Sequence, residues 1–367
     1  MHRLLAMAPP GLEPAVAREL TLLGHDVVVN PGHVALTVDD LAAVASLCHR
    51  ARTPARLLLP VAQGHARTLD ELARLVRGAD WSPYLDRKDE VAVQVIKSQA
   101  RIRRKDVAER KVTHAIADAL RKARGTHARR PPVEQLVRVR LERDQAVVSI
   151  DVGGGLLHKR GWRTDSGKAP IRETLAASLL VLAGWTSDEP LLDPFCGAGT
   201  LPIEAALMGA KRSAFVGRSL PCTRWPALAG RRPPRVPAAA GGFARSIQGC
   251  DHSERAIERS RANAQRAGVS VSFKQVDVAK VEAASDPGLV ICNPPYGARL
   301  GKDDQAVRGV YKALGRSLRG SLSGWRALFL APNPRLAGLV DRDAFQITTF
   351  SNGGMRVGVW GLDPRQV

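Results

Sequence analysis

The sequence has few cysteines, and their arrangement builds neither a metal site nor a disulfide framework. The five cysteines are scattered, odd in number and form no CxxC pair. Cys196, Cys250 and Cys292 stand at the ends of apolar runs, where a reduced cysteine acts as a small hydrophobic residue. We therefore expect no metal ion and a reducing, cytoplasmic location.

Long apolar runs are also lacking. The longest, residues 175–185, is too short to cross a bilayer, and the amino terminus has no apolar core of a signal peptide. Glycine and proline are numerous but follow no period, which argues against a collagen-like or wholly disordered chain. With 367 residues, 44% of them apolar, the chain is long enough for two or three domains and a sizeable core. No membrane association is expected.

Acidic residues are in short supply. There are 35 Asp and Glu against 55 Lys and Arg, which leaves a net charge of +20 and suggests a polyanionic partner, most often nucleic acid. Residues 211–246 hold eight Lys and Arg and no acid, and residues 97–143 are also strongly basic. A solvated basic surface would explain one such stretch, but two of them favour nucleic acid.

From about residue 155 onward, strand-like and helix-like segments alternate. This pattern predicts a parallel, doubly wound α/β sheet. Two strand patterns joined by Asn352, Gly353 and Gly354 predict a closing antiparallel hairpin over residues 345–363. The expected strands are 190–195, 246–251, 271–277, 288–293 and 326–333, and the expected helices are 200–210 and 254–268, the second ending at Gly268.

The first 150 residues predict a different organisation, with one or two small α+β units and breaks near Thr53 and Gly153. Residues 229–246 are rich in Pro, Gly, Ala and Arg, which predicts a flexible basic insertion. The expected helices are 13–24 and 39–51, with a short strand at 25–30. Segments 68–81, 90–99, 106–123 and 135–151 are expected to mix helices and strands.

The segment LLDPFCGAGT, residues 191–200, ends a strand and opens a helix. Gly197 and Gly199 let the backbone approach a ligand, and the helix start offers free N–H groups. Alone this could be a plain turn, and it lacks the third glycine of a dinucleotide-binding fingerprint. Asp251 ends the second strand, where it could accept hydrogen bonds from ribose hydroxyls or cap the next helix. With Asp277 placed to face an adenine amino group, the set favours a nucleoside-bearing cofactor.

The segment Asn293-Pro294-Pro295-Tyr296 ends the fourth strand. The two prolines fix the backbone and push Asn293 into an extended conformation. The Asn293 side-chain oxygen and the Pro294 carbonyl could then accept both N–H bonds of an exocyclic amino group and aim its lone pair at an electrophile. Tyr296 could stack on the base. A strand-terminating turn is the plain alternative.

Five segments of the chain are informative together: LHKRGWRTDSGKAPIRETLAASLLVLAGW (157–185), DPFCGAGTLPIEAA (193–206), RWPAL (224–228), NPPYGARLG (293–301) and FSNGGMRVGVW (350–360). They resemble the THUMP-domain RNA methyltransferases that act on the N2 amino group of guanine in tRNA or large-subunit rRNA. The resemblance implies a seven-stranded Rossmann-like methyltransferase domain over 154–367, with a flexible basic insert near 211–246. It also implies a ferredoxin-like piece over 1–52 and a THUMP RNA-binding domain over 53–153.

The resemblance implies S-adenosylmethionine as cofactor and RNA as partner, with no obligatory protein partner evident. The implied catalytic residues are Asn293, Pro294, Pro295 and Tyr296. The implied cofactor-binding residues are Asp193, Phe195, Gly197, Gly199, Thr200, Asp251, His252, Asp277, Val278 and Asn293. The expected RNA-binding residues are Lys97, Arg101, Arg103, Arg104, Lys105, Lys159, Arg160, Arg163 and Arg299.

Two other functions stay open from the sequence. An adenine-N6 methyltransferase on RNA or DNA would use the same Asn-Pro-Pro-Tyr segment, because the chemistry suits any exocyclic amine. A non-catalytic RNA-binding assembly factor is the alternative from another class, and intact Asp193, Asp251, Asn293 and Tyr296 argue against it. Methylation of a protein glutamine fits the positive charge poorly, and a dinucleotide oxidoreductase would leave Asn-Pro-Pro-Tyr without a role.

Overall fold

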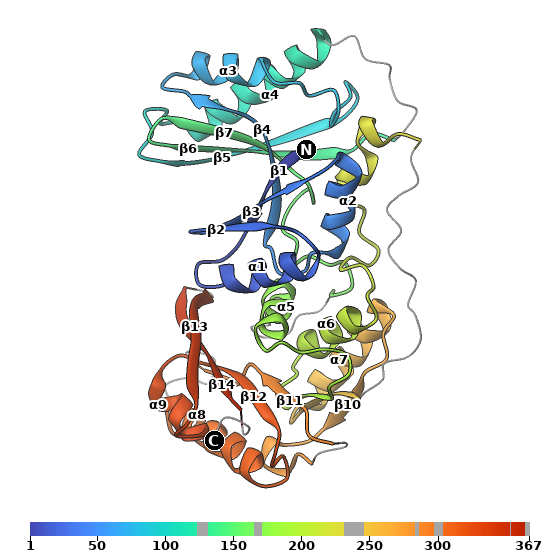
Figure 1. Cartoon of the computed structure of the whole chain (residues 1–367), viewed down its shortest axis with the longest axis vertical. Coiled ribbons are helices and arrows are strands. Elements are labelled where there is room, and N and C mark those ends of the chain that lie inside the picture. The colour runs from blue at the N-terminus through green and yellow to red at the C-terminus, as the bar shows by residue number, and fades with distance from the viewer. Residues whose placement is uncertain are drawn as a thin grey trace.

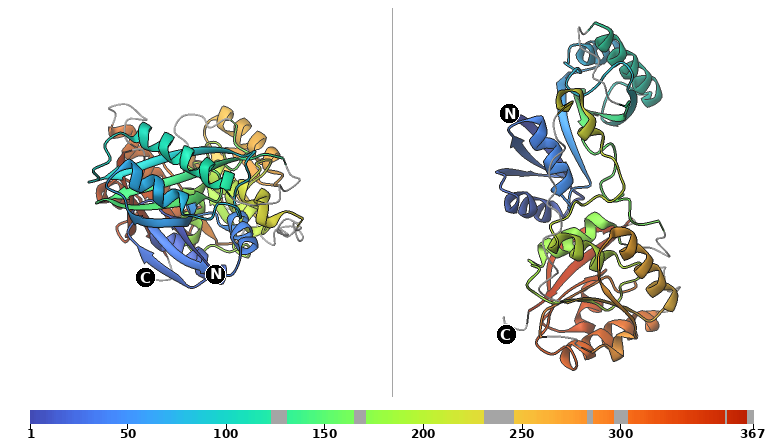
Figure 2. Two further views of the ribbon diagram at one scale, coloured as in Figure 1. Left: turned by 90° about the horizontal axis from the view of Figure 1, so that it is seen from above. Right: turned by 90° about the vertical axis from the view of Figure 1, so that its right-hand side faces the viewer.

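A computed structural model describes residues 1–122, 131–164, 171–230, 246–282, 286–296, 304–352 and 354–363. The chain forms two lobes, one above the other in Figure 1, and each is built around its own seven-stranded sheet. The side view in Figure 2 shows a narrow junction between the lobes. No helix in the described part of the chain is long and apolar enough to cross a membrane.

The upper sheet has the strand order β2-β3-β1-β4-β7-β6-β5. Only β5 runs parallel to its neighbour β6, and the other pairs are antiparallel. Arg143 and Asp144 both have positive φ and make the tight turn between β6 and β7. The strands are β1 (His2–Met7), β2 (Val27–Asn30), β3 (His33–Val38), β4 (Arg56–His65), β5 (Glu90–Ser98), β6 (Glu134–Glu142) and β7 (Gln145–Asp151).

Helices of the upper lobe pack their apolar sides into one continuous core with this sheet. They are α1 (Glu13–Leu22), α2 (Leu41–Arg50), α3 (Leu69–Arg77) and α4 (Lys105–Lys122). β4 pairs with β1 on one side and with β7 on the other. The predicted division at Thr53 therefore falls in a connection inside a single sheet, so that residues 1–153 share one hydrogen-bonded framework.

The lower sheet has the order β10-β9-β8-β11-β12-β14-β13. Its first five strands are parallel, and β14 and β13 close it as an antiparallel hairpin, which confirms the predicted doubly wound α/β fold. The strands are β8 (Leu191–Asp193), β9 (Ile247–Asp251), β10 (Ser272–Gln275), β11 (Leu289–Cys292), β12 (Arg326–Ala331), β13 (Phe345–Asn352) and β14 (Met355–Leu362).

The helices of the lower lobe are α5 (Glu173–Leu182), α6 (Thr200–Gly209), α7 (Glu254–Ala267), α8 (Asp304–Arg319) and α9 (Pro334–Val340), with short 3₁₀ helices η1 (Pro221–Arg224), η2 (Pro226–Leu228) and η3 (Val278–Lys280). Two of them, α6 and α7, lie where the sequence predicts them, and α5, α8 and α9 were not predicted. Gly268 ends α7 in the left-handed conformation, as predicted.

The described part of the predicted flexible insert, residues 211–230, is instead packed against the upper lobe. Trp225 is fully buried and donates a hydrogen bond of 3.0 Å from its ring nitrogen to the Gln135 side chain. Phe215 and Cys222 join the core of the upper lobe. The expectation of flexibility is wrong for this part, because its apolar side chains are buried in the core of the upper lobe and hold the segment in place. Residues 231–245 lie outside the described residues.

The closing hairpin also contacts the upper lobe. The Thr348 hydroxyl donates a hydrogen bond of 2.8 Å to the carbonyl of Gly11. A Cβ on Gly11 would lie 1.8 Å from the Thr349 carbonyl oxygen, and its φ of +91° is left-handed, so only glycine fits here. The two lobes are therefore joined by close contact between main-chain atoms as well as by side-chain contacts.

Candidate active site at the carboxyl edge of the lower sheet

Four parallel strands of the lower sheet end at one edge, and each has a predicted site residue at its end or just after it. β8 ends at Asp193, β9 at Asp251, β10 shortly before Asp277, and β11 just before Asn293. Strand order reverses between β8 and β11, and ligands of open α/β sheets bind outside the carboxyl ends at such a point. The tertiary fold thus brings together residues spread over a hundred positions.

The glycine turn between β8 and α6 is shaped by two left-handed residues. Gly197 has φ +54°, and a Cβ there would meet nothing within 4 Å. Gly199 has φ +80°, and a Cβ there would press against Ser260 at 3.0 Å. Gly199 therefore lets the turn pack on the lobe, whereas Gly197 keeps open space in front of it. Thr200 is buried as the first residue of α6.

Asp251 is bound to the glycine turn. One carboxylate oxygen accepts the Gly197 N–H at 3.0 Å and the other accepts the Ser253 N–H at 2.9 Å. α7 begins after Ser253, without a side-chain cap, so the alternative in which Asp251 caps that helix is wrong. Its side chain is 14% exposed, and each oxygen keeps a lone pair for a further donor. The neighbouring His252 is exposed.

The Asp193 carboxyl is 2% exposed and accepts the Phe195 N–H at 3.0 Å. Burial raises its pKa well above the ordinary range, and the nearby charge of Asp251 adds to this. Burial therefore disfavours the charged form of this carboxyl, and a cationic group that enters the site would favour it.

Asp277 lies at the start of η3 and accepts the Ala279 N–H at 2.9 Å. It is exposed, whereas the following Val278 is buried. Local capping accounts for its position, and its role toward an adenine ring stays a prediction.

Asn293 is half-buried at the end of β11, with Pro294 buried behind it. Its side-chain oxygen is buried and accepts no hydrogen bond from the described residues. Buried amide oxygens are nearly always satisfied, so this atom lacks a partner that the site should supply.

Tyr296 is placed differently from the predicted stacking platform. Its ring is fully buried in the core of the lower lobe, and its hydroxyl accepts a hydrogen bond of 2.9 Å from the Asn352 side chain at the end of β13. A base could stack on the ring only if this segment moved. Base stacking by Tyr296 therefore stays a prediction, while the contact with Asn352 was not foreseen from the sequence.

Two of the predicted RNA-binding arginines are structural, which corrects the prediction. Arg160 is fully buried, pairs with Glu204 at 3.2 Å and donates to the Arg52 carbonyl at 2.6 Å. Arg163 is 11% exposed and pairs with Glu173 at 2.7 Å. Basic residues in a run are usually solvated, but here buried acids on α6 and α5 hold them inside. Lys159 is exposed, and Arg299 lies outside the described residues.

These buried charges form a network at the junction of the lobes. Arg52, which follows α2, contacts Glu204 at 3.5 Å and donates to the Leu207 carbonyl at 3.0 Å. Glu19 of α1 accepts the main-chain N–H of Arg52 at 2.8 Å. Glu204 lies one turn into α6, so the upper lobe fixes the helix that follows the glycine turn. The sequence gives no local signal for this network, because the charged residues that pair in it lie far apart along the chain.

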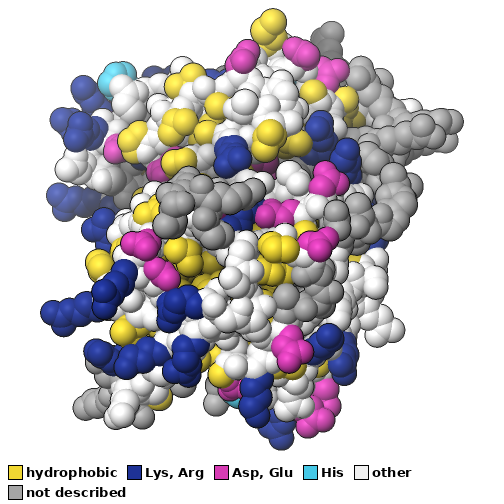
Figure 3. Space-filling view, turned by 60° about the horizontal axis from the view of Figure 1, so that its bottom comes forward, with side chains coloured by type: hydrophobic (Ala, Val, Ile, Leu, Met, Phe, Trp, Pro, Cys, Tyr) yellow, Lys and Arg dark blue, Asp and Glu magenta, His cyan; other side chains and the backbone are white. Residues whose placement is uncertain are grey.

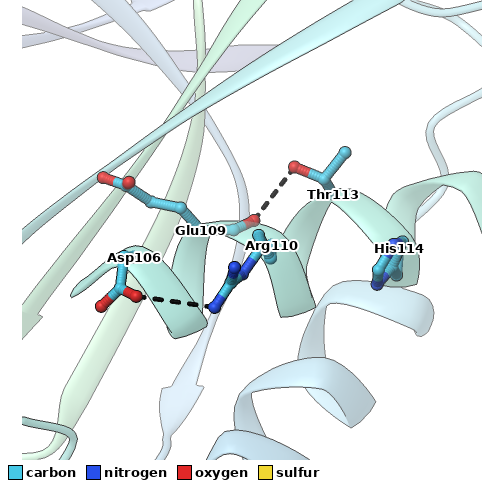
Figure 4. A pocket seen from close by; sticks show the side chains of 5 residues that line it. All are labelled: Asp106, Glu109, Arg110, Thr113 and His114. Carbon is cyan, nitrogen blue, oxygen red and sulfur yellow. Dashed lines mark hydrogen bonds and ion pairs between the residues drawn. The ribbon is translucent and has the colours of Figure 1, made fainter. Parts of the chain in front are cut away.

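The predicted RNA-binding residues of the upper lobe lie around the start of α4. Arg101, Arg103, Arg104 and Lys105 are exposed, and Lys97 is half-buried. Several cations here are paired. Figure 4 shows Arg110 reaching Asp106 beside a hollow on α4, at 3.5 Å, and Arg104 contacts the same carboxylate at 2.7 Å. Arg103 and Lys105 make no ion pair with the described residues.

Comparisons with known proteins identify the family. The RMKL-like methyltransferase domain matches residues 160–358, and the RlmL ferredoxin-like domain matches residues 3–58. The chain belongs to the RMKL-like methyltransferase family. YpsC of Bacillus subtilis strain 168, which carries an RNA methyltransferase name, is 32% identical over 96% of this chain and 93% of its own length. The large-subunit ribosomal RNA methyltransferase K/L of Syntrophotalea carbinolica is 31% identical over 98% of this chain.

This methyltransferase spans 53% of that K/L protein's length, so it corresponds to about half of such relatives. Among solved structures, SMU.472 in complex with SAH has a TM-score of 0.88 at 29% identity, covering 100% of this chain and 99% of its own. A Listeria monocytogenes protein titled an N6-adenine-specific DNA methylase has a TM-score of 0.82 at 29% identity, covering 99% of this chain and 96% of its own.

The cofactor of this methyltransferase is S-adenosylmethionine, and the site fits it. Open space in front of Gly197 leaves room beside the turn, Asp251 keeps acceptor capacity for ribose hydroxyls, and the Asn293 oxygen lacks a partner. No group of three His, Cys, Asp or Glu side chains within the described ranges could hold a metal ion.

Proposed function

We propose that this chain methylates the exocyclic N2 amino group of a guanosine in RNA. The observation that carries the proposal is the buried, unpartnered oxygen of Asn293 at the carboxyl edge of the sheet. It is an acceptor with no donor, at the position where an aromatic amine would enter. The names of the relatives favour RNA, and the resemblance of the NPPY segment to guanine-N2 enzymes favours guanosine.

Each site residue has a role in the proposal. S-adenosylmethionine supplies an electrophilic methyl group when bound. Asp193, Phe195, Gly197, Gly199 and Thr200 would hold its methionine part, Asp251 with His252 its ribose, and Asp277 with Val278 its adenine. Asn293 and Pro294 would accept the two N–H bonds of the target amine, Pro295 would stiffen the segment, and Tyr296 would support the base.

The rest of the chain would hold the RNA. The continuous sheet of residues 1–153 would act as one RNA-holding module, formed by the ferredoxin-like piece (1–52) and the THUMP domain (53–153), with residues 154–367 as the catalytic domain. Exposed cations near the start of α4 would contact phosphates, which place the substrate but carry little sequence information. The target base would leave any helical stack to reach Asn293, at a cost of a few kcal/mol.

Adenine-N6 methylation is the second candidate, because the Listeria structure carries that name. The experiment that separates the two incubates the protein with methyl-labelled S-adenosylmethionine and either total RNA or genomic DNA, followed by nucleoside analysis. We expect label in N2-methylguanosine from RNA. Label in N6-methyladenosine, or in its deoxy form from DNA, would support the second candidate. The absence of label from both nucleic acids, with S-adenosylhomocysteine still bound, would contradict the proposal and favour an RNA-binding assembly factor.

A further inference from the structure

α8 is covered on two sides and leaves one basic face. Val307, Tyr311, Leu314 and Leu318 are buried in the core beneath the sheet. A Cβ on Gly315 would lie 2.2 Å from a carbonyl oxygen of α9, so α8 and α9 pack closely. Its exposed positions include Arg308, Lys312, Arg316 and Arg319, which we name the α8 stripe.

The α8 stripe has an unusual charge balance. Its cations are spaced by four, four and three residues, so they line one face of the helix over about 16 Å. Asp304 is the only acidic residue of α8, at its first position. On α7, by contrast, Glu254 and Glu258 alternate with arginines. Figure 3 turns this end of the molecule forward and shows Lys and Arg side chains gathered at its lower left, with acidic side chains beside the upper ones.

Folding alone does not explain the stripe. Arg319 pairs with Asp341 at 3.3 Å, and the last turn of a helix favours cations, which accounts for Arg316 and Arg319. Arg308 lies in the second turn of α8 and Lys312 in its middle, outside the last turn where the dipole favours cations, and the two repel each other at i,i+4. Neither forms an ion pair with a described acid. A bound polyanion would relieve this repulsion.

The stripe also starts beside the active site. In a β-helix-β unit the helix follows the carboxyl end of its strand, so α8, between β11 and β12, begins at the edge that carries Asn293. Arg308 is the stripe residue nearest that edge, and Arg319 is the farthest. A strand of nucleic acid whose base reaches Asn293 can therefore lay its phosphates along α8.

We propose that the α8 stripe binds the phosphate backbone of the RNA substrate on the catalytic domain, away from the α4 cations. This inference rests on the proposed function and adds a second contact surface to it. Two anchored surfaces would hold the RNA on both sides of the flipped base, so the stripe determines how the substrate is oriented in the site.

The test compares R308Q/K312Q/R316Q with R255Q/R335Q/R342Q, which removes the same charge from exposed positions of the catalytic domain outside the stripe. The probe is an unmodified large-subunit rRNA transcript, with its affinity measured over a series of salt concentrations. For the stripe variant we expect affinity to fall about tenfold or more and the salt slope to fall by about three. R308K/R316K should keep the slope, and S-adenosylhomocysteine affinity and melting temperature should not change.

The outcomes separate this inference from the proposed function. If the wild-type protein binds and methylates RNA but the stripe variant keeps its affinity and slope, the stripe proposal is wrong and the proposed function stands. If the control variant loses as much as the stripe variant, the effect is one of net charge and the proposal is also wrong. If the wild-type protein neither binds nor methylates RNA, both fail.

Discussion

The Asn352 side-chain amide donates a hydrogen bond of 2.9 Å to the Tyr296 hydroxyl and so joins the end of β13 to the segment that carries Asn293. The two residues are 56 positions apart in the sequence. Because Tyr296 is fully buried, this bond helps to set where Asn293 and Pro294 stand at the sheet edge. The closing hairpin is therefore part of the active-site framework.

The first prediction is that Asn352→Ala and Tyr296→Phe each lower kcat about two- to tenfold, the scale of one net hydrogen bond, while S-adenosylhomocysteine affinity is kept. If the bond is what matters, the double variant should lose no more than either single one. Asn30→Ala, on the exposed strand β2, is the control. Fully additive losses would show that the two side chains act separately.

The second prediction concerns the target amine. Asn293→Ala should keep cofactor affinity but slow turnover by about a hundredfold or more, because it removes an acceptor used in the transition state. Single-turnover methylation and calorimetric titration with S-adenosylhomocysteine measure the two quantities. Normal turnover in this variant would remove Asn293 from the mechanism.

The third prediction concerns the buried charges at the lobe junction. Glu204→Gln leaves Arg52 and Arg160 buried without their shared counter-charge, so the free energy of unfolding should fall by about 3–5 kcal/mol. Denaturant titration measures this change. Glu142→Gln, which breaks a surface pair with Arg140, should change little. Equal effects of the two variants would show that the junction network adds nothing to stability.

The fourth prediction concerns RNA binding by the upper lobe. Neutralising Arg101, Arg103, Arg104 and Lys105 together should weaken binding and flatten its dependence on salt. Asp106→Asn should do the opposite, because it frees Arg104 and Arg110 from their ion pairs. Titration of a labelled rRNA transcript at several salt concentrations checks both, and unchanged affinity in the first variant would count against this surface.

The fifth prediction concerns acid stability. Burial, with the charges of Arg172 and Arg163 nearby, lowers the pKa of His158 from 6.5 to about 4. Between these values the unfolded chain binds a proton that the folded protein does not, so this histidine makes the fold less stable as pH falls from about 6.5 to about 4. Chemical unfolding at stepped pH should show a shallower loss for His158→Gln. Identical curves would exclude His158 as a contributor.

Local sequence patterns determined most secondary structure of the lower lobe and the nature of its site. Asp193, Asp251 and Asn293 each end or directly follow an apolar run. Such a run and the polar residue that ends it are visible in neighbouring residues of the sequence, so these strands could be predicted. The closing hairpin was predicted from the turn residues Asn352, Gly353 and Gly354 between two strand patterns. In the upper lobe β1, β3 and β4 were missed, since their pairing is with strands distant in sequence and their apolar pattern is short.

The tertiary structure alone decided which charged and aromatic side chains face solvent. Arg160 and Arg163 stand in a basic run, yet Glu204 and Glu173 hold them inside, while α8 presents its cations outward. Tyr296 is buried in a cluster that includes residues as distant in sequence as Leu12 and Val359, and its hydroxyl bonds Asn352. A sequence records the charge and size of a residue, but its solvation depends on which distant elements pack over it, and that is settled only when the whole chain has folded.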